Sequence, residues 1–211
     1  MGTVMVVDQN RPQQDVLQEA VRVLRADGVL VMPTDSVYGI GCAATPQNPA
    51  HERIFAIKRR DRSQTLPWLV SNAQDLVAYG RDVPAWMGRL AAELWPGALT
   101  LVVAASDLVP PEYRAANGTI ALRMPNSNLV RALAREVGPL ATTSANTHGE
   151  AAATDGVGVE PRIVVAADLV LNAGPAPLSI ASTIVGSEGG EPRVYREGAI
   201  SAELIRKTVR G

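Results

Sequence analysis

The chain has 211 residues, 46% of them hydrophobic, and a formal net charge of −1. These values are typical of a globular protein with one large domain or two small ones, and they give no overall field that attracts nucleic acid or membranes. One cysteine and two histidines exclude an intramolecular disulfide and a zinc site built from Cys and His. The stretch MGTVMVVDQNRPQQD lacks the regions of a signal peptide, and no apolar run approaches the roughly 20 residues of a membrane span, so we expect a cytoplasmic protein.

The first two predicted helices carry clear boundary signals. In the stretch 12–28 the apolar side chains recur at helical spacing, and Gly28 is a suitable end for the helix. In the stretch 48–60, Asn48 is a suitable N-cap and Pro49 suits the first helical position. Both stretches are therefore predicted to be amphipathic helices.

Helices and strands alternate along the rest of the chain. Strands are predicted at 29–32, 66–70, 98–105, 119–124, 139–143, 168–172, 182–185 and 193–196, and helices at 84–95, 128–138 and 201–210. This alternation predicts the α/β class. No internal repeat or low-complexity linker interrupts the chain, so a single domain over 1–211 is the simpler interpretation.

The segment PTDSVYGIG, residues 33–41, is unusually polar for the exit of a core strand. Its glycines would let a ligand approach the backbone, and its polar side chains offer donors and acceptors: Thr34, Asp35, Ser36 and Tyr38. An ordinary proline-initiated turn explains the same residues equally well. The following GIGCAA matches a dinucleotide fingerprint only in letters, because prolines follow it where that motif must open a helix.

The segment 56–70 places four cations at the end of a predicted helix: Lys58, Arg59, Arg60 and Arg62. Such a cluster can neutralise a triphosphate, with arginine binding oxygens in pairs. Cations at a helix C-terminus also complement the helix dipole and are often only solvated, and taken alone this segment favours that alternative.

Two further segments carry polar groups directly after strands, where α/β folds place ligands. Arg123 ends an apolar strand and needs an anionic partner, which either a structural or a ligand carboxylate would provide. In TTSANTHG, residues 142–149, Ser144 and Asn146 are two apart and are expected to reach one crevice, although a polar loop is the common alternative. His148 has no evident acid to orient it and is interpreted as loop surface.

Together these segments resemble the YrdC/Sua5 family, the L-threonylcarbamoyladenylate synthases. The matching blocks are PTDSVYGIGCAA, IFAIKRRDRSQTLPWLV, LWPGALTLVV, TIALRMPNSNLVRAL, PLATTSAN, STIV and VYREGAIS. They extend from about residue 14 to about residue 205 in register, and the chain length fits the short, single-domain form of the family. Departures from the family pattern are Asp61, Leu69 and Glu197, which concern loop rigidity and the rim of the threonine pocket.

The resemblance implies both a fold and a reaction. The fold is α/β, a twisted open mixed sheet with flanking helices around a concave basic cavity. In the reaction, ATP, L-threonine and bicarbonate give L-threonylcarbamoyl-AMP and pyrophosphate with Mg²⁺, the first step towards N6-threonylcarbamoyladenosine in tRNA. A separate threonylcarbamoyl transferase complex would use the product, and contact with tRNA is a further expectation.

The resemblance also assigns roles to residues. The catalytic set is Lys58, Arg60, Ser144 and Asn146. The ATP contacts are Arg60, Gln64, Thr119, Asn146, Thr154 and Arg196. The L-threonine contacts are Ser36, Arg123, Ser144 and Ser182, and no residues are assigned to a metal.

Two alternatives to the synthase function stay open. A carbamoyltransferase domain of the hydrogenase-maturation kind would come from much longer, cysteine-containing chains, which a chain of 211 residues with one cysteine does not match. A non-catalytic module that binds double-stranded RNA or tRNA is weakened by the net charge of −1. The segment 147–158 is the candidate lid of the site.

Overall fold

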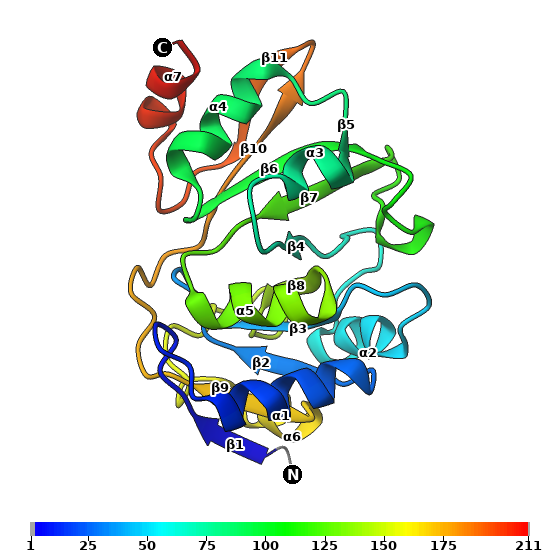
Figure 1. The fold of residues 1–211 in the computed structure, drawn as a ribbon, viewed down its shortest axis with the longest axis vertical. Coiled ribbons are helices and arrows are strands. Elements are labelled where there is room, and N and C mark those ends of the chain that lie inside the picture. Colours follow the sequence, from blue (N-terminus) through cyan, green and yellow to red (C-terminus); the bar gives the residue numbers. More distant parts are fainter. Residues whose placement is uncertain (1–2, 211) are drawn as a thin grey trace.

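Eleven strands of the computed structural model, which describes residues 3–210, form one continuous mixed sheet (Figure 1). Their order across the sheet is β1 (Thr3–Val6), β9 (Leu169–Asn172), β2 (Leu30–Met32), β3 (Gly39–Ala43), β8 (Leu140–Ser144), β4 (Trp68–Leu69), β7 (Thr119–Arg123), β6 (Leu99–Ala105), β10 (Thr183–Glu188) and β11 (Glu191–Arg196), and β5 (Gly80–Arg81) pairs with β6. β9 is parallel to β1 and β2, β4 to β7, and β10 to β6. The other pairs are antiparallel, so the predicted mixed α/β sheet is confirmed.

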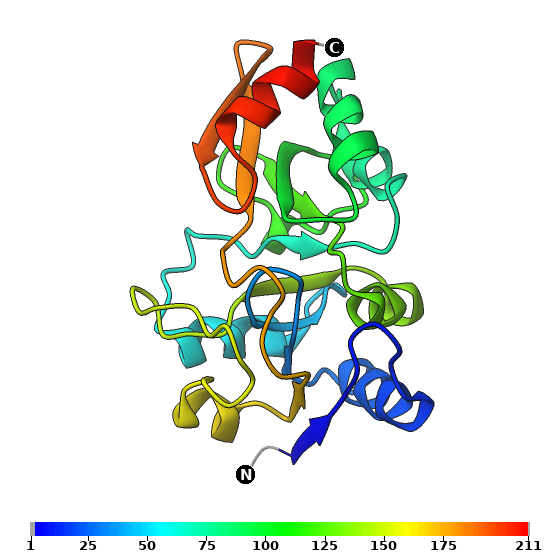
Figure 2. The same cartoon turned by 90° about the vertical axis from the view of Figure 1, so that its left-hand side faces the viewer.

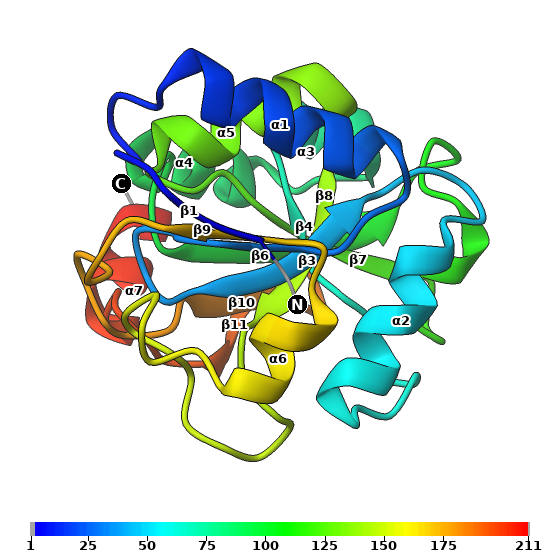
Figure 3. The same cartoon turned by 90° about the horizontal axis from the view of Figure 1, so that it is seen from below.

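Helices cover both faces of this sheet. They are α1 (Gln14–Arg25), α2 (Pro49–Lys58), α3 (Asp75–Tyr79), α4 (Ala85–Leu94), α5 (Asn128–Val137), α6 (Pro161–Ala166) and α7 (Ala202–Arg210), with a short 3-10 helix at Pro111–Tyr113. α1 and α5 lie side by side on one face, whereas α2 and α6 lie on the other (Figures 2 and 3). α4 packs against α7 at the end of the molecule that holds the C-terminus (Figure 1).

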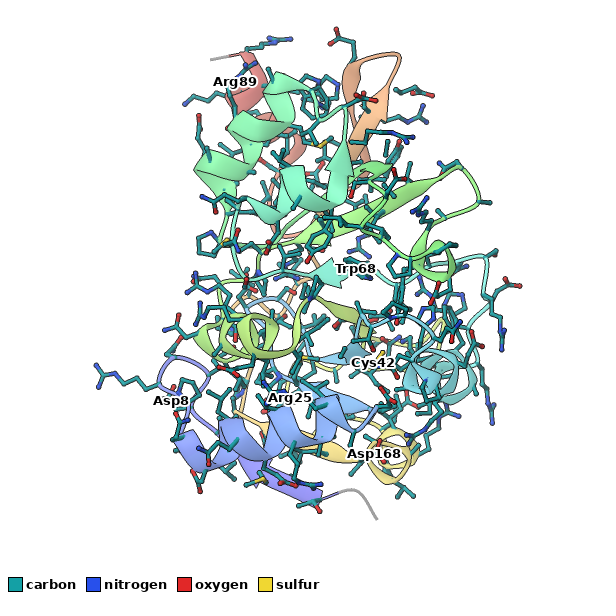
Figure 4. The ribbon with its side chains drawn as sticks, turned by 45° about the vertical axis from the view of Figure 1, so that its right-hand side comes forward. Asp8, Arg25, Cys42, Trp68, Arg89 and Asp168 are labelled. Carbon is teal, nitrogen blue, oxygen red and sulfur yellow. The ribbon has the colours of Figure 1, made fainter. Side chains whose placement is uncertain are left out.

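Both faces of the sheet are buried near its centre. In β2, Leu30 and Met32 pack with α1 and α5, while Val31 belongs to the larger cluster on the opposite face. Alternating side chains of a strand point to opposite faces, so a strand buried on both sides is apolar throughout. Cys42 and Trp68 lie inside the molecule, whereas Arg89 lies at its end, where Nη2 donates to Val209 O of α7 at 2.7 Å (Figure 4).

Three helix boundaries that the sequence predicted are confirmed, whereas α1 ends at Arg25, before the predicted end at Gly28. Asn48 Oδ1 accepts from Ala50 N at 2.8 Å, which caps α2. Gly138 follows α5 with φ of 84°, a conformation that glycine adopts without strain. The predicted cap of the final helix is present as well, since Ser201 Oγ accepts from Leu204 N at 3.2 Å.

The end of the polar segment 33–41 belongs to a strand that the sequence did not predict. Gly39–Ala43 form β3, a buried central strand that pairs antiparallel with β2 and β8. The glycines serve packing here, because a Cβ on Gly41 would lie 2.5 Å from Thr142 Oγ1 and 2.8 Å from Ala141 O. The strand also confirms that GIGCAA does not open a helix. Four other elements, β1, α3, β5 and α6, were not predicted from the sequence.

Candidate functional site

A cavity of about 410 Å³ opens where the polar segments meet. Strands β8, β4, β7, β6, β10 and β11 contribute side chains to it, β3 contributes Gly39, and the loop that follows β8 contributes further side chains. Its lining includes Thr34, Ser36, Tyr38, Gly39, Arg60, Thr100, Ala121, Arg123, Thr143, Ser144, Asn146, Glu150, Ser182, Ile184 and Arg196. A second groove, of about 520 Å³, runs along α1 and contains none of the predicted site residues.

Arg123 is buried at the end of β7 and is held by three hydrogen bonds. Nη2 donates to Asp35 Oδ1 at 2.5 Å, Nη1 to Ser36 Oγ at 2.7 Å, and Nε to Gly97 O at 3.0 Å. The sequence left its anionic partner undecided, and the structure provides Asp35, a structural carboxylate. A guanidinium has five N–H groups, so two are not used by these three bonds. Burial lowers the pKa of Arg123, and the Asp35 carboxylate opposes this.

Thr34 and Tyr38, the other polar residues of the segment 33–41, make hydrogen bonds that fix the wall of the cavity next to Arg123. Thr34 Oγ1 donates to Val37 O at 2.7 Å and lies 3.0 Å from Ser36 Oγ, which fixes the Ser36 hydroxyl. Tyr38 is fully buried and its hydroxyl donates to Gly174 O at 2.7 Å. These bonds place Ser36 at the cavity beside the Arg123 guanidinium.

Lys58 is only 1% exposed and lies behind the wall formed by the Ser-x-Asn segment. Its Nζ donates to Ser144 O and to Asn146 O, both at 2.5 Å. Burial, followed by the nearby charge of Arg60, lowers the pKa of Lys58 to about 8. Among residues 3–210, no carboxylate forms an ion pair with it. The ammonium is therefore held by backbone carbonyls and does not itself line the cavity.

The four cations that are clustered in the sequence lie in different surroundings in the structure. Arg60 alone lines the cavity, with Nε donating to Gln64 O at 2.9 Å. Arg59 is exposed and adopts the left-handed conformation at the end of α2, and Arg62 pairs with Glu52 on the surface. The tight spacing in the sequence is lost because α2 ends at Lys58 and the chain turns there.

The far side of the cavity is built from β10 and β11. Arg196 Nη2 donates to Ser182 O at 2.8 Å, and Ser182 Oγ lies 2.8 Å from Thr100 Oγ1 of β6. All three residues line the cavity. Thr100 was missed by sequence reasoning, although a hydroxyl within the apolar run ALTLVVAA is a signal that could have identified it.

Three residues that the resemblance assigned to ATP lie outside the cavity lining: Gln64, Thr119 and Thr154. The side chain of Gln64 is exposed, and its contact with Arg60 is made by the carbonyl. Thr119 starts β7 and shares the face of Ala121, but its hydroxyl donates to Asn117 Oδ1 at 2.7 Å. Thr154 lies exposed in the loop after β8.

Neither histidine contributes to the cavity. His51 is buried against Tyr113, with ring centroids 4.4 Å apart, and His148 is exposed in the loop after β8, as predicted. Within the described residues, no three His, Cys, Asp or Glu side chains are grouped so that they could hold a metal ion. Over the same residues, no helix has the length and apolar character needed to cross a membrane.

Comparison with known proteins identifies a family model and relatives with similar sequences. A family model for Sua5, YciO and YrdC proteins, described as telomere recombination, matches residues 22–198. A Pseudomonas putida protein named threonylcarbamoyl-AMP synthase is 34% identical over 193 residues, which are 90% of this chain and 96% of that protein.

Solved structures extend the likeness to the fold. Pyrococcus abyssi Sua5, in complex with L-threonine, superposes with a TM-score of 0.91 at 27% identity, over 97% of this chain and 60% of that one. Escherichia coli YciO superposes with a TM-score of 0.88 at 26% identity, over 97% of this chain and all of that one. The chain therefore belongs to the Sua5/YciO/YrdC family.

Proposed function

We propose that this protein is an L-threonylcarbamoyladenylate synthase, which converts ATP, L-threonine and bicarbonate to L-threonylcarbamoyl-AMP and pyrophosphate. The observation that carries the proposal is the meeting of Ser36 and Arg123 with Arg60 and Arg196 in one cavity. Such a cavity offers hydroxyl and cationic groups for a small amino acid beside cations for a triphosphate. The name of the P. putida relative and the threonine complex of P. abyssi Sua5 support the same reaction.

The threonine site is proposed on the side of the cavity that β7 and β10 form. The amino-acid carboxylate would bind the two N–H groups of Arg123 that its protein partners leave unused. Ser36 and Ser182, with Ser144 opposite, would bind the threonine hydroxyl and amine. Asp35 keeps the guanidinium oriented without lining the cavity itself.

The triphosphate is proposed to lie against Arg60 and Arg196, with Asn146 beside it. Contacts of ATP with Gln64, Thr119 and Thr154 would require the nucleotide to extend beyond the cavity towards exposed segments. Mg²⁺ would enter with the nucleotide and be held mainly by its phosphates, the usual arrangement for this ion. Glu150, which lines the cavity, is the carboxylate of this chain best placed to bind that ion or its waters.

The chemistry needs no histidine. Bicarbonate takes up a proton and releases water to give CO2. The amine of threonine attacks this CO2 and loses a proton, and an oxygen of the resulting carbamate attacks the α-phosphorus of ATP. The bond between that phosphorus and the bridging oxygen breaks, and pyrophosphate leaves. The work of the protein is to align the two substrates and to offset charge, which the arginines supply. A protein that catalyses this reaction would be a nucleotidyltransferase.

The biological setting is part of the proposal. The product would pass in the cytoplasm to a threonylcarbamoyl transferase complex acting on tRNA, and direct contact with tRNA is proposed as well. The continuous sheet supports a single domain over 1–211. The loop 147–158 remains the proposed lid.

Pyrophosphate release tests the function directly. Purified protein with ATP, Mg²⁺, L-threonine and bicarbonate is expected to release pyrophosphate and to form threonylcarbamoyl-AMP, detected by mass spectrometry. Reactions without threonine, and the variant Lys58→Ala, are the controls. Pyrophosphate release no faster than in these controls would refute the proposal, and salt-sensitive RNA binding without turnover would favour a non-catalytic RNA-binding module.

A further inference from the structure

Thr147 lies between two residues that both bind Lys58. Asn146 O accepts from Lys58 Nζ at 2.5 Å, and His148 N donates to Lys58 O at 2.9 Å. A displacement of Thr147 would therefore move both backbone groups on either side of it. Contacts that hold Thr147 therefore act on two of the groups that bind Lys58.

Glu160 holds Thr147 through two short hydrogen bonds. Thr147 N donates to Glu160 Oε1 and Thr147 Oγ1 donates to Glu160 Oε2, each at 2.6 Å. Hydrogen bonds to an ionised carboxylate are shorter and stronger than those between neutral groups. The same two bonds lower the pKa of Glu160, which is therefore ionised at neutral pH.

The same contact closes the loop 148–159 at its base. Glu160 immediately precedes α6, so the two ends of the loop meet at Thr147. The middle of the loop is held separately, because Tyr38 N donates to Ala153 O at 2.8 Å. Glu150 of this loop lines the cavity, so the closure at Thr147 also positions one part of the cavity wall.

α6 is joined to the end of α2 by a second residue. Arg162 Nη2 donates to Ile57 O, one residue before Lys58, and Arg162 Nε lies 3.5 Å from Glu160 Oε2. The carboxylate of Glu160 therefore lies near two cations, Arg162 and Lys58, and both charges lower its pKa.

We propose that Glu160 is a positioning residue of this site: its carboxylate fixes Thr147, and through Thr147 it fixes the Ser144–Asn146 segment and Lys58. Glu160 does not line the cavity and lies outside the set of residues that the resemblance assigned. Its effect on turnover rests on the proposed function, whereas its effect on Lys58 is independent of that function.

The charge of Glu160 acts on Lys58 in a defined direction. Burial is the largest cause that lowers the pKa of Lys58 to about 8, and the charges of Arg60 and Arg162 act in the same direction. Glu160 opposes them and raises the pKa of Lys58. Removing the charge of Glu160 while keeping its shape should therefore lower the pKa of Lys58 further.

An NMR titration tests this without any assay of turnover. The chain has two lysines, Lys58 and Lys207, so ¹³C-labelled lysine gives two Cε signals to follow. Lys207 is exposed on α7 and is an internal control. Glu160→Gln is expected to lower the pKa of Lys58 and to leave that of Lys207 unchanged. A pKa of Lys58 equal to that of the wild type would contradict the placement of the Glu160 carboxylate close to Lys58, on which the proposal rests.

Turnover gives the second test. Glutamine can accept from Thr147 N and donate to its hydroxyl, so Glu160→Gln should keep most of kcat. Glu160→Ala loses both bonds and should lower kcat roughly 10- to 100-fold, since small misplacements near reacting groups are costly. Thr147→Val, which keeps the backbone bond, should fall between the two.

A matched control separates this role from a general loss of a carboxylate. Glu112 also accepts a backbone N–H, from Gln47 at 2.7 Å, but it is exposed and lies outside the cavity lining. Glu112→Gln should leave kcat and the pKa of Lys58 unchanged. A wild-type kcat in Glu160→Ala would show that Glu160 does not position the site. If the wild type itself releases no pyrophosphate, the proposed function fails, and the titration still decides the role of Glu160.

Discussion

Replacing Lys58 with methionine should remove one contribution to the pH dependence of the free energy of unfolding, namely the titration of the Lys58 amine. Lys58 is 1% exposed and its amine donates to two carbonyl oxygens, and over residues 3–210 no carboxylate forms an ion pair with it. Desolvation disfavours its charged form, so the folded protein binds this proton more weakly than the unfolded chain does. Methionine is similar in length and has no proton to lose.

The expected magnitude follows from the pKa of Lys58, which falls from 10.5 to about 8. Each tenfold change in proton affinity is worth about 1.4 kcal/mol, so the protonated amine costs the folded state about 3 kcal/mol. Below pH 8 both states hold the proton and this cost is present in full. Between pH 8 and 10.5 the unfolded chain binds more protons than the folded protein, so the free energy of unfolding rises with pH.

Urea unfolding followed by tryptophan fluorescence measures this difference. The free energy of unfolding of the wild type, minus that of Lys58→Met, should rise by about 3 kcal/mol between pH 7 and pH 10.5. Taking the difference removes the titration of tyrosines and other groups that both proteins share. A difference that stays constant over this range would show that the Lys58 amine is not desolvated, and the account of its pKa would be wrong.

Three further changes have defined outcomes. Asp35→Asn leaves the charge of Arg123 buried without its partner and should lower the free energy of unfolding by about 3 kcal/mol, measured in urea; a loss below about 1 kcal/mol would show that the pair is replaceable. Gly41→Ala places a methyl carbon 2.8 Å from Ala141 O, so a loss of about 1–3 kcal/mol is expected, and an unchanged midpoint would contradict the close packing of β3. Arg60→Ala should raise the KM for ATP at least about tenfold in pyrophosphate release, with the KM for threonine nearly unchanged; equal effects on both would place this cation between the substrates.

The order of helices and strands follows from patterns that the sequence displays locally. Helical spacing of apolar residues and the caps at Asn48, Gly138 and Ser201 predicted α2, α5 and α7, because a cap is a contact between residues close in the chain. β3 was missed because its sequence, GIGCA, has low strand propensity and is held by close packing against β8.

Some features of the candidate site could likewise be predicted from the sequence, whereas others could not. The sequence by itself determined which segments carry polar groups at strand ends. It also determined that these segments resemble one family, since both features depend only on the order of residues along the chain. Only the tertiary structure decided that Asp35 is the partner of Arg123, that Arg60 alone of the clustered cations lines the cavity, and that Glu160 binds Thr147. These contacts join residues far apart in the chain, and their geometry is set by the sheet and by where each helix ends.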